Sequence, residues 1–295
     1  MTILFFGAGD DSCIELAVEA AVDLGVEFRL VDQRVLNDDE ILLEVGTTEI
    51  TCLARVAGEV FDVMGVGAIY ARPLGIGEST QALAFSAAMA EWLDLSPGLV
   101  VNRPLSMRSN SSKPYQAQLI AHSGFSVPDT LVTNDPDEVL AFHARHGRVI
   151  FKSTSGIRSI VHELDASRLT SLQRIRGLPT QFQEHIDGVD IRVHVVGDSI
   201  FPTRVVSDAM DYRYARQEGA DVELETMELD EDTSRRCVEL AARLDLPLCG
   251  IDLRQTPDGR LVCFEVNPMP AFSYYETNTG QPIARTLVEF LAEND

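Results

Sequence analysis

The chain has 295 residues, of which 45% are hydrophobic, and a formal net charge of −22 at pH 7. This length suffices for one large core or for two to three lobes, and the apolar content excludes a wholly disordered chain. The acidic excess argues against a nucleic-acid partner, because phosphate backbones bind basic surfaces. A bound anion would therefore have to meet a local cluster of basic residues.

The start of the sequence and its cysteines predict a cytoplasmic protein. The first nine residues contain no basic residue and are followed by Asp10 and Asp11, unlike a signal peptide. No apolar run approaches the about 20 residues that a membrane helix needs, so we expect no membrane partner. The cysteines are odd in number and widely spaced, which favours reduced core thiols over a disulfide or zinc framework.

The first hundred residues predict an α/β lobe. Residues 2–7 and 27–32 have the composition of strands, and residues 13–24 between them have helical apolar spacing. A hairpin at residues 41–56, a further strand at residues 67–73 and a long helix at residues 79–95 follow. The glycine turn after the first strand lacks the full GxGxxG pattern of dinucleotide sites. We therefore expect a structural or substrate-side lobe here.

Two lysines in the middle of the sequence stand where phosphates could bind. Lys113 lies where a polar loop meets a predicted helix, and backbone N–H groups and the helix dipole favour an anion there. Lys152 ends a predicted strand and precedes a small-residue turn with Ser153, Ser155 and Gly156. Such a turn can lay N–H groups over phosphates. An exposed solubilising lysine and a plain hairpin turn are the alternatives.

Residues 181–198 predict a strand, a turn and another strand. Gln183 and Glu184 end the first strand, where an adenine could pair with exposed backbone and a carboxylate could accept its exocyclic amine. Asp190 and Arg192 are two residues apart in the second strand and so face the same side. An acid there could hold a ribose diol, as could many solvated acids.

Arg213 lies in a later, basic and aromatic segment, and guanidinium groups suit transferred phosphoryl groups.

The last two predicted strands bring three oxygen ligands together. Asp252 lies in the strand at residues 248–255, and Glu265 and Asn267 stand two apart in the strand at residues 261–267. A short turn joins the strands into a hairpin, and alternation places Glu265 and Asn267 on one face. Two carboxylates and an amide oxygen suit Mg2+, which keeps waters and shares its shell with phosphates. An acidic rim on an edge hairpin is the alternative.

The order of these features resembles that of the ATP-grasp ligases, from residue 100 to the end. The phrases QFQEHIDGVDIRVHVVGD and CFEVNPMPAFSYYETNTG are most similar to the RimK-type glutamate ligases and to the ligases that cyclise microviridin-type peptides. The resemblance implies two α+β lobes behind an N-terminal pre-ATP-grasp α/β domain. The expected boundaries are residues 1–100 for that domain, 101–186 for the central lobe with the phosphate lid, and 187–295 for the C-terminal lobe with the metal site.

The resemblance also implies a role for each residue singled out above. The phosphates of ATP would be bound by Lys113 and Lys152, with Ser153, Ser155 and Gly156 in the lid turn. The adenine would be held by Gln183, Glu184 and His185, and the ribose by Asp190. The metal site, for two Mg2+ ions with Mn2+ as an alternative, would be formed by Asp252, Glu265 and Asn267. The transferred phosphoryl group would face Arg213 and Arg192.

Some residues depart from the family pattern. The lid turn has few glycines and carries Arg158, and the segment after Arg213 lacks the basic, glycine-rich phrase of glutamate ligases. Phe272, Tyr274 and Tyr275 stand where those ligases have smaller residues. These aromatic side chains could contact a bulky acceptor such as a peptide, or simply pack.

The sequence thus predicts an ATP- and Mg2+-dependent carboxylate–amine or carboxylate–hydroxyl ligase that acts through an acyl phosphate. Phosphoryl transfer needs positioning and charge neutralisation more than a protein nucleophile, and no Ser-His-Asp or Cys-His pattern is found. A peptide or protein side chain is the favoured carboxylate substrate. The alternatives are ligation of amino acids or other small molecules, and a non-catalytic ATP-binding sensor. A homo-oligomer is left open.

Overall fold

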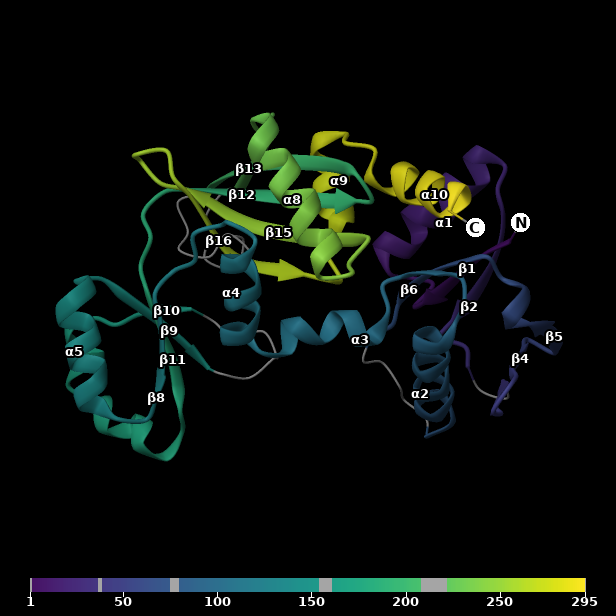
Figure 1. Cartoon of the computed structure of the whole chain (residues 1–295), viewed down its shortest axis with the longest axis horizontal. Helices are drawn as coiled ribbons and strands as arrows, with labels where there is room; N and C mark the ends of the chain where they lie inside the picture. Colours follow the sequence, from purple (N-terminus) through teal and green to yellow (C-terminus); the bar gives the residue numbers. More distant parts are fainter. Residues whose placement is uncertain (1, 37–38, 75–79, 154–160, 208–221, 295) are drawn as a thin grey trace.

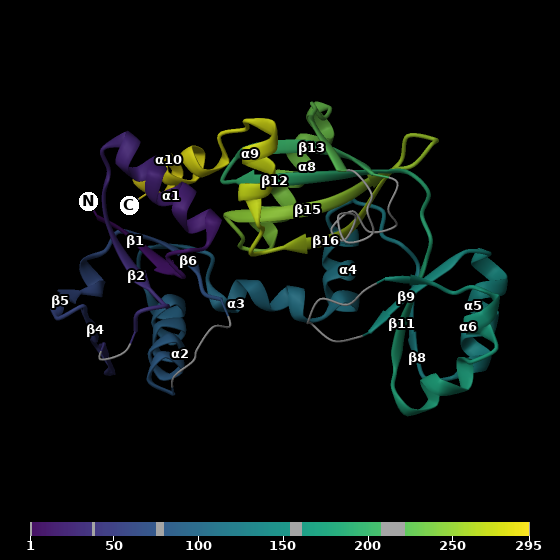
Figure 2. The same cartoon turned by 180° about the vertical axis from the view of Figure 1, so that it is seen from behind.

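A computed structural model describes residues 2–36, 39–74, 80–153, 161–207 and 222–294 (Figure 1). Four β-sheets with covering helices make up this part of the chain, which confirms the predicted α/β fold class. Figure 2 shows the same arrangement from behind, with the first and last helices side by side. None of the described helices has the length and apolar character needed to cross a membrane.

The N-terminal sheet is parallel and has the strand order β2-β1-β6-β7. Its strands are β1 (Thr2–Gly7), β2 (Glu27–Asp32), β6 (Ala68–Arg72) and β7 (Leu99–Val101). Helices α1 (Ser12–Leu24) and α2 (Thr80–Leu95) connect them. The Asp11 carboxylate accepts hydrogen bonds from the first free N–H groups of α1, and Gly25, with φ of 65°, ends the helix in the left-handed conformation. The predicted βαβ start is confirmed.

The predicted hairpin is also confirmed, and a third strand extends it. Strands β3 (Glu40–Val45), β4 (Ile50–Val56) and β5 (Glu59–Asp62) form an antiparallel sheet beside the N-terminal sheet. A one-turn 3-10 helix, η1 (Val63–Gly65), leads back to β6.

The glycine turn after β1 is closed by a carboxylate of the chain itself. Asp32 Oδ1 accepts hydrogen bonds from the Gly9 amide at 2.8 Å and from the Arg34 amide at 2.9 Å. A Cβ atom on Gly9 would lie 2.5 Å from Asp32 Oδ2. The turn therefore needs glycine in order to approach an internal anion.

The second lobe is built on an antiparallel sheet of order β10-β9-β11-β8. Its strands are β8 (Thr130–Thr133), β9 (Val149–Ser153), β10 (His162–Glu163) and β11 (Thr180–Glu184). Helix α5 (Pro136–His146) and the short helices α6 (Ala166–Leu169) and η3 (Leu172–Gly177) cover one face. Three short helices lead into this lobe from β7: α3 (Pro104–Met107), η2 (Arg108–Ser111) and α4 (Lys113–His122).

The C-terminal sheet is antiparallel and has the order β14-β13-β12-β15-β16. Its strands are β12 (Val189–Val196), β13 (Ser199–Ser207), β14 (Val222–Thr226), β15 (Leu248–Gln255) and β16 (Leu261–Asn267). The alternating residues Ile191, Val193 and Val195 pack with helix α8 (Glu231–Arg243) on one face. Residues 190, 192 and 194 consequently point to the opposite face. Helices α9 (Phe272–Thr279) and α10 (Ile283–Glu293) end the chain.

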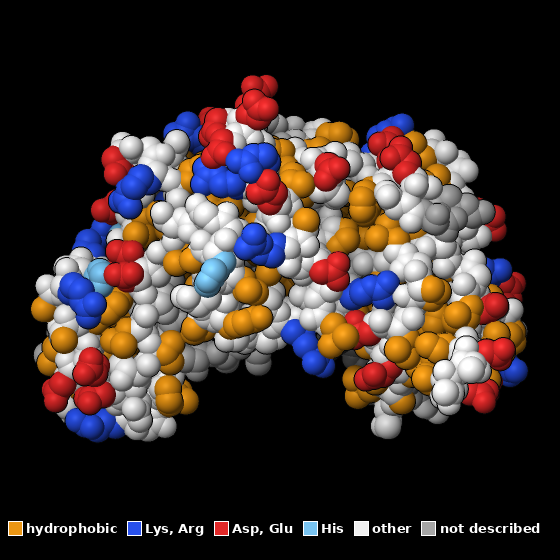
Figure 3. Space-filling view, viewed as in Figure 1, with side chains coloured by type: hydrophobic (Ala, Val, Ile, Leu, Met, Phe, Trp, Pro, Cys, Tyr) orange, Lys and Arg blue, Asp and Glu red, His pale blue; other side chains and the backbone are white. Residues whose placement is uncertain are grey.

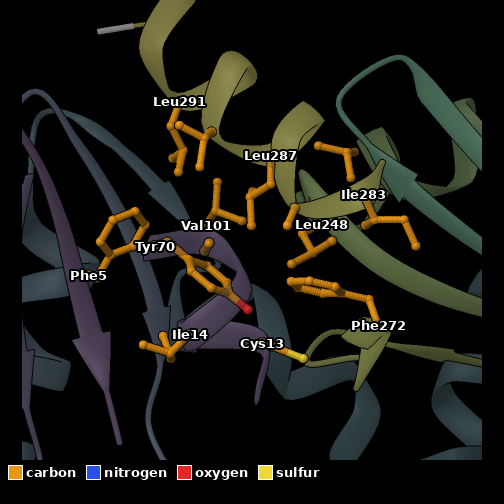
Figure 4. Close-up of a cluster of buried hydrophobic side chains, with 14 of the residues drawn as sticks. Phe5, Cys13, Ile14, Tyr70, Val101, Leu248, Phe272, Ile283, Leu287 and Leu291 are labelled. Atoms are coloured by element: carbon orange, nitrogen blue, oxygen red, sulfur yellow. The ribbon is translucent and has the colours of Figure 1, made fainter. Parts of the chain in front are cut away.

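One hydrophobic core joins the N-terminal and C-terminal sheets. Phe5 and Tyr70 of the first sheet, Leu248 of the last sheet and Leu287 of α10 all belong to one buried cluster (Figure 4). Helix α10 also packs against α1. The lobe that carries α5 is separated from the lobe that carries α2 by a hollow in the molecular surface (Figure 3). The N-terminal sheet is thus fastened to the C-terminal sheet by a shared core.

Arg103 fastens the connection between α2 and β7. Its guanidinium donates to the carbonyls of Leu93 (2.8 Å), Asp94 (3.3 Å), Ser96 (2.9 Å) and Gly98 (2.8 Å). A cation at the end of a helix also interacts favourably with the helix dipole.

We expect Arg103→Met to lower the free energy of unfolding by about 2 kcal/mol, because hydrogen bonds from a charged donor are lost while the apolar stem remains. Urea unfolding measures this. Arg108→Met, at an exposed position of η2, is the control and should change stability by less than about 0.5 kcal/mol. Equal effects of the two substitutions would contradict the assigned role of Arg103.

Candidate active site

The predicted metal ligands, from two neighbouring strands, lie on one face of the C-terminal sheet together with an arginine of a third strand. Asp252 of β15 is directly opposite Glu265 of β16, and Gly250 is opposite Asn267. On the other side of β15, Arg192 of β12 is opposite Asp252. Directly opposite residues in antiparallel strands share a face. The two carboxylates and the amide are therefore brought together, as the hairpin argument predicted.

Each carboxylate of this face contacts a cation of the chain. Glu265 Oε1 lies 2.5 Å from Lys113 Nζ, and Asp252 is bonded to Arg192. Asp190 accepts two hydrogen bonds from Arg254, at 2.7 and 2.9 Å. Acids and bases thus alternate along and across β12 and β15. The negative charge of the three carboxylates is therefore balanced by Lys113, Arg192 and Arg254.

Lys113 reaches the face from the start of helix α4. Its ammonium also donates to Asn110 Oδ1 at 2.6 Å. The Lys113 and Glu265 side chains retain 23% and 21% of their exposure, so solvent and small ligands can reach this pair. The prediction that Lys113 stands at a helix start is confirmed.

The other predicted phosphate-binding residues are placed only in part. Lys152 lies in β9 opposite Gln181 of β11, and Ser153 ends β9. Ser155, Gly156, Arg158 and Arg213 lie outside the described residues.

The expected adenine hinge lies at the end of β11, but much of it is bonded within the protein. The Glu184 amide donates to the Asp129 carbonyl at 3.0 Å, and Glu184 Oε1 accepts from the Asp129 amide at 2.9 Å. The His185 amide donates to the Arg148 carbonyl at 3.0 Å, and Gln183 Nε2 donates to Thr130 Oγ1 at 3.1 Å. The strand end is therefore less exposed than the sequence suggested, because β8 and the loop before it run alongside.

A cavity of about 240 Å³ lies directly after this strand end. Residues 185–190 and 204–206 line it together with Arg254. Burial and the nearby Arg148 lower the pKa of His185, which favours the neutral imidazole. Two residues predicted to bind the nucleotide, His185 and Asp190, thus line the same cavity.

Two residues of this face were not predicted from the sequence. Arg254 holds Asp190 and also donates to the Ile186 carbonyl at 2.8 Å. Gly250 makes room for Arg192, since a Cβ atom there would lie 2.7 Å from the guanidinium carbon. The signal for Arg254 is its position two residues after Asp252 in the same strand, which places both on one face. Gly250 has no comparable signal, because its role depends on its neighbour across the sheet.

The aromatic residues after β16 are mostly core residues. Phe272 is fully buried and Tyr275 is 5% exposed, so the packing alternative holds for both. Tyr274 is half-buried and its ring lies edge-on to that of Tyr275, with centroids 5.6 Å apart. The Tyr275 ring also lies 5.8 Å from the guanidinium carbon of Arg192. Tyr275 therefore packs against Arg192 of the face.

His194 is a buried histidine next to this face. It is fully buried, its ring lies 4.7 Å from that of Tyr275, and within the described part of the chain neither ring nitrogen has a hydrogen-bond partner. Burial, and then the charge of Arg192, hold the pKa of His194 well below its usual value. The imidazole is therefore neutral at pH 7.

The sheets and the facing carboxylates described above are those expected of the ATP-grasp class. The sequence model of the RimK-like ATP-grasp domain matches residues 110–291, and the chain belongs to this family. It is an ATP-grasp ligase, a class that couples ATP cleavage to formation of an amide or ester bond. The recognition of the fold and of the reaction class from the sequence is confirmed.

Curated relatives and solved structures resemble most of the chain. A probable alpha-L-glutamate ligase of Vibrio atlanticus is 23% identical over 221 residues, 71% of this chain and 72% of that protein. A protein of the same name from Teredinibacter turnerae is 25% identical over the same shares. The ATP-grasp ligase PsnB has a TM-score of 0.83 and 26% identity over 99% of this chain and 98% of its own. The macrocyclase MdnC of Microcystis aeruginosa has a TM-score of 0.84 at 20% identity, over 99% and 100%.

We expect His194→Leu to remove part of the acid sensitivity of folding. Because the folded-state pKa lies below the unfolded value of about 6.5, only the unfolded chain binds this proton as the pH falls, and stability is lost below that pH. At pH 5.5 the loss from this group is at most about 1.4 kcal/mol, the value for a folded state that binds no proton.

Urea unfolding at pH 7.5 and pH 5.5 measures this loss in each protein. The fall in stability between the two pH values should be smaller in His194→Leu than in the natural chain. The exposed His122, changed to Leu, is the control and should behave as the natural chain does. An unchanged pH dependence in His194→Leu would show that His194 is protonated equally in both states.

Proposed function

We propose that this protein activates a carboxylate of a peptide or protein side chain with ATP and Mg2+ and joins it to an amine or hydroxyl group. The observation that carries the proposal is the shared face of Asp252, Glu265 and Asn267, with Lys113 and Arg192 beside it. The peptide substrate is supported by the PsnB structure, whose ligase is complexed with a phosphomimetic variant of its minimal precursor, Mg and ADP.

The donor atoms of the face fit a hard divalent cation. Two carboxylates and an amide oxygen are ligands that Mg2+ takes together with water and phosphate oxygens. Mg2+ is the expected ion, with two ions in the full site and Mn2+ as the alternative. When bound, the metal neutralises charge on the phosphates and holds them for transfer. Because Lys113 already contacts Glu265, we expect its ammonium to be released toward the phosphates when a divalent cation takes its place.

The remaining roles follow the family pattern on this scaffold. Residues 1–100 form the N-terminal domain, 101–186 the central lobe and 187–295 the metal-binding lobe. In our proposal the phosphates are bound by Lys113, Lys152, Ser153, Ser155 and Gly156. The adenine is held by Gln183, Glu184 and His185. Asp190, held by Arg254 through both oxygens, keeps lone pairs with which to accept ribose hydroxyls.

The reaction then proceeds in two displacements. A carboxylate oxygen of the substrate attacks the γ-phosphorus, the bond to the β–γ bridging oxygen breaks, and ADP leaves. The amine or hydroxyl next attacks the acyl carbon, phosphate leaves, and the attacking group loses its proton. Arg192 is 7% exposed and faces the site, where a fixed cation stabilises developing phosphoryl charge strongly. Arg213 is proposed for the same task.

We expect hydroxylamine to trap the activated carboxylate. Hydroxylamine attacks an acyl phosphate and leaves a hydroxamate, which mass spectrometry detects in a reaction with ATP, Mg2+, amino acids and acidic peptides. Glu265→Gln should abolish both hydroxamate and ADP, because the facing pair of carboxylates is lost. Glu223→Gln, at an exposed position of edge strand β14, is the matched control and should keep both.

The carrier of the hydroxamate decides between the alternatives. A hydroxamate on a peptide supports the proposal, whereas one on a free amino acid would favour a small-molecule ligase. Turnover that survives in Glu265→Gln would remove that residue from the metal site. If neither hydroxamate nor ADP forms with a broad pool, the sensor alternative is favoured.

Lys152 offers a second, direct test. The chain contains only two lysines, Lys113 and Lys152, so lysine acylation read by mass spectrometry reports each separately. We expect ATP with Mg2+ to protect both from acylation. Lys152→Ala should weaken nucleotide binding about 10- to 100-fold, since an ammonium–phosphate hydrogen bond contributes on the order of 1.5–3 kcal/mol. Arg174→Ala, an exposed cation of the same lobe, should bind normally. Unchanged affinity in Lys152→Ala would make Lys152 a surface residue.

A further inference from the structure

Three buried polar side chains hold the backbone that follows Glu265. They bond Val266, Pro268 and Pro270, every second residue of the segment. The three side chains are Gln116, Asn102 and Arg72, which are 1%, 2% and 6% exposed. None of them comes from the C-terminal sheet to which Glu265 belongs.

Gln116 pairs with Val266, the residue between Glu265 and Asn267. Its Nε2 donates to the Val266 carbonyl at 2.8 Å, and its Oε1 accepts from the Val266 amide at 3.1 Å. Strand β16 is at the edge of its sheet, so the side-chain amide satisfies the two backbone groups as a neighbouring strand would. Lys113, three residues earlier in α4, contacts Glu265. Helix α4 therefore fixes both the backbone and the counter-ion of one expected metal ligand.

Asn102 extends this anchoring from the N-terminal sheet. Its Nδ2 lies 2.6 Å from both the Leu248 and Pro268 carbonyls, and its Oδ1 accepts from the Leu248 amide at 3.3 Å. One side chain thus joins the start of β15 to the segment that follows β16. The two strands that carry the expected metal ligands are held at the same point.

Arg72 completes the set at the end of β6. Its Nη1 donates to the Pro270 carbonyl at 2.9 Å, and its Nε donates to Asp11 at 2.8 Å. In open parallel sheets the carboxyl ends of the strands commonly surround a ligand. Here the carboxyl ends of β6 and β7 hold the backbone of another lobe.

Directional hydrogen bonds fix position in a way that apolar packing does not. Polar groups are stable in a protein interior only when their hydrogen bonds are satisfied, and each of these three side chains satisfies backbone groups beside the expected metal ligands. Removal of a residue that orients a metal ligand typically lowers the affinity for the metal about 10–100-fold.

We propose that Gln116, Asn102 and Arg72 are positioning residues that set the placement of Glu265 and Asn267 and thereby the affinity for the divalent cation. Arg72 and Asn102, at the carboxyl ends of β6 and β7, then link the N-terminal sheet to the placement of the expected metal ligands. This inference rests on the proposed function, in which Glu265 and Asn267 bind the metal.

The test compares two glutamines of one helix. Gln116→Met and the exposed Gln118→Met are the same substitution, nearly equal in volume, two residues apart in α4. Isothermal titration calorimetry measures the affinity for ADP at a series of Mg2+ concentrations. The quantity to compare is the Mg2+ concentration at which the increase in ADP affinity is half of its maximum. We expect this concentration to rise about tenfold in Gln116→Met and to stay unchanged in Gln118→Met. ADP affinity without a divalent cation should be the same in both, which a general loss of structure would not allow.

Two further variants make each outcome decisive. Arg72→Lys keeps a cation for Asp11, but the shorter lysine side chain loses the hydrogen bond to the Pro270 carbonyl. This variant should also raise the Mg2+ concentration for half-maximal enhancement of ADP binding. If Gln116→Met does not fold, Arg72→Lys tests the positioning role in its place. Glu265→Gln should abolish the Mg2+ effect. If it does not, the proposed metal site fails. If it does, and both Gln116→Met and Arg72→Lys match the natural chain, the positioning role alone is overturned.

Discussion

The antiparallel register of β12, β15 and β16 is the constraint on which the site depends. With Arg192 opposite Asp252 and Asp252 opposite Glu265, acids and bases of three strands share one face. A slip of one residue in β12 would turn Asp190 and Arg192 toward the core under α8. The apolar residues Ile191, Val193 and Val195 exclude that slip, because they must remain buried. Packing on one face thus fixes the chemistry on the other.

The charges of this face are balanced locally, although the protein as a whole is acidic. The chain carries a net charge of −22, yet each carboxylate of the face contacts an arginine or lysine. The arginines lie between strands and are held by two or more contacts, whereas Lys113 is a compact ammonium on a flexible stem at the open side. An arginine fork is suited to a fixed position and a lysine to exchange between partners.

The N-terminal sheet is joined to the C-terminal sheet by apolar and polar contacts together. The shared core of α1, α10 and the two sheets fixes their relative position, and the hydrogen bonds of Asn102 and Arg72 refine it at the segment after β16. The second lobe is separated from the N-terminal lobe by a hollow (Figure 3). In this arrangement the face with Glu265 belongs to the sheet that shares its core with the N-terminal sheet, whereas Lys152 belongs to the second lobe.

The sequence by itself determined the α/β class, the βαβ start, the hairpin of β15 and β16, and the shared face of Glu265 and Asn267. These features depend on alternation and short turns, which are local. Only the tertiary structure decided that Asp32 closes the glycine turn, that Glu184 is bonded to Asp129, and that Gln116, Asn102 and Arg72 hold the segment after Glu265. These residues are far from their partners in the sequence, and no local sequence pattern indicates which distant group a buried polar side chain will bond.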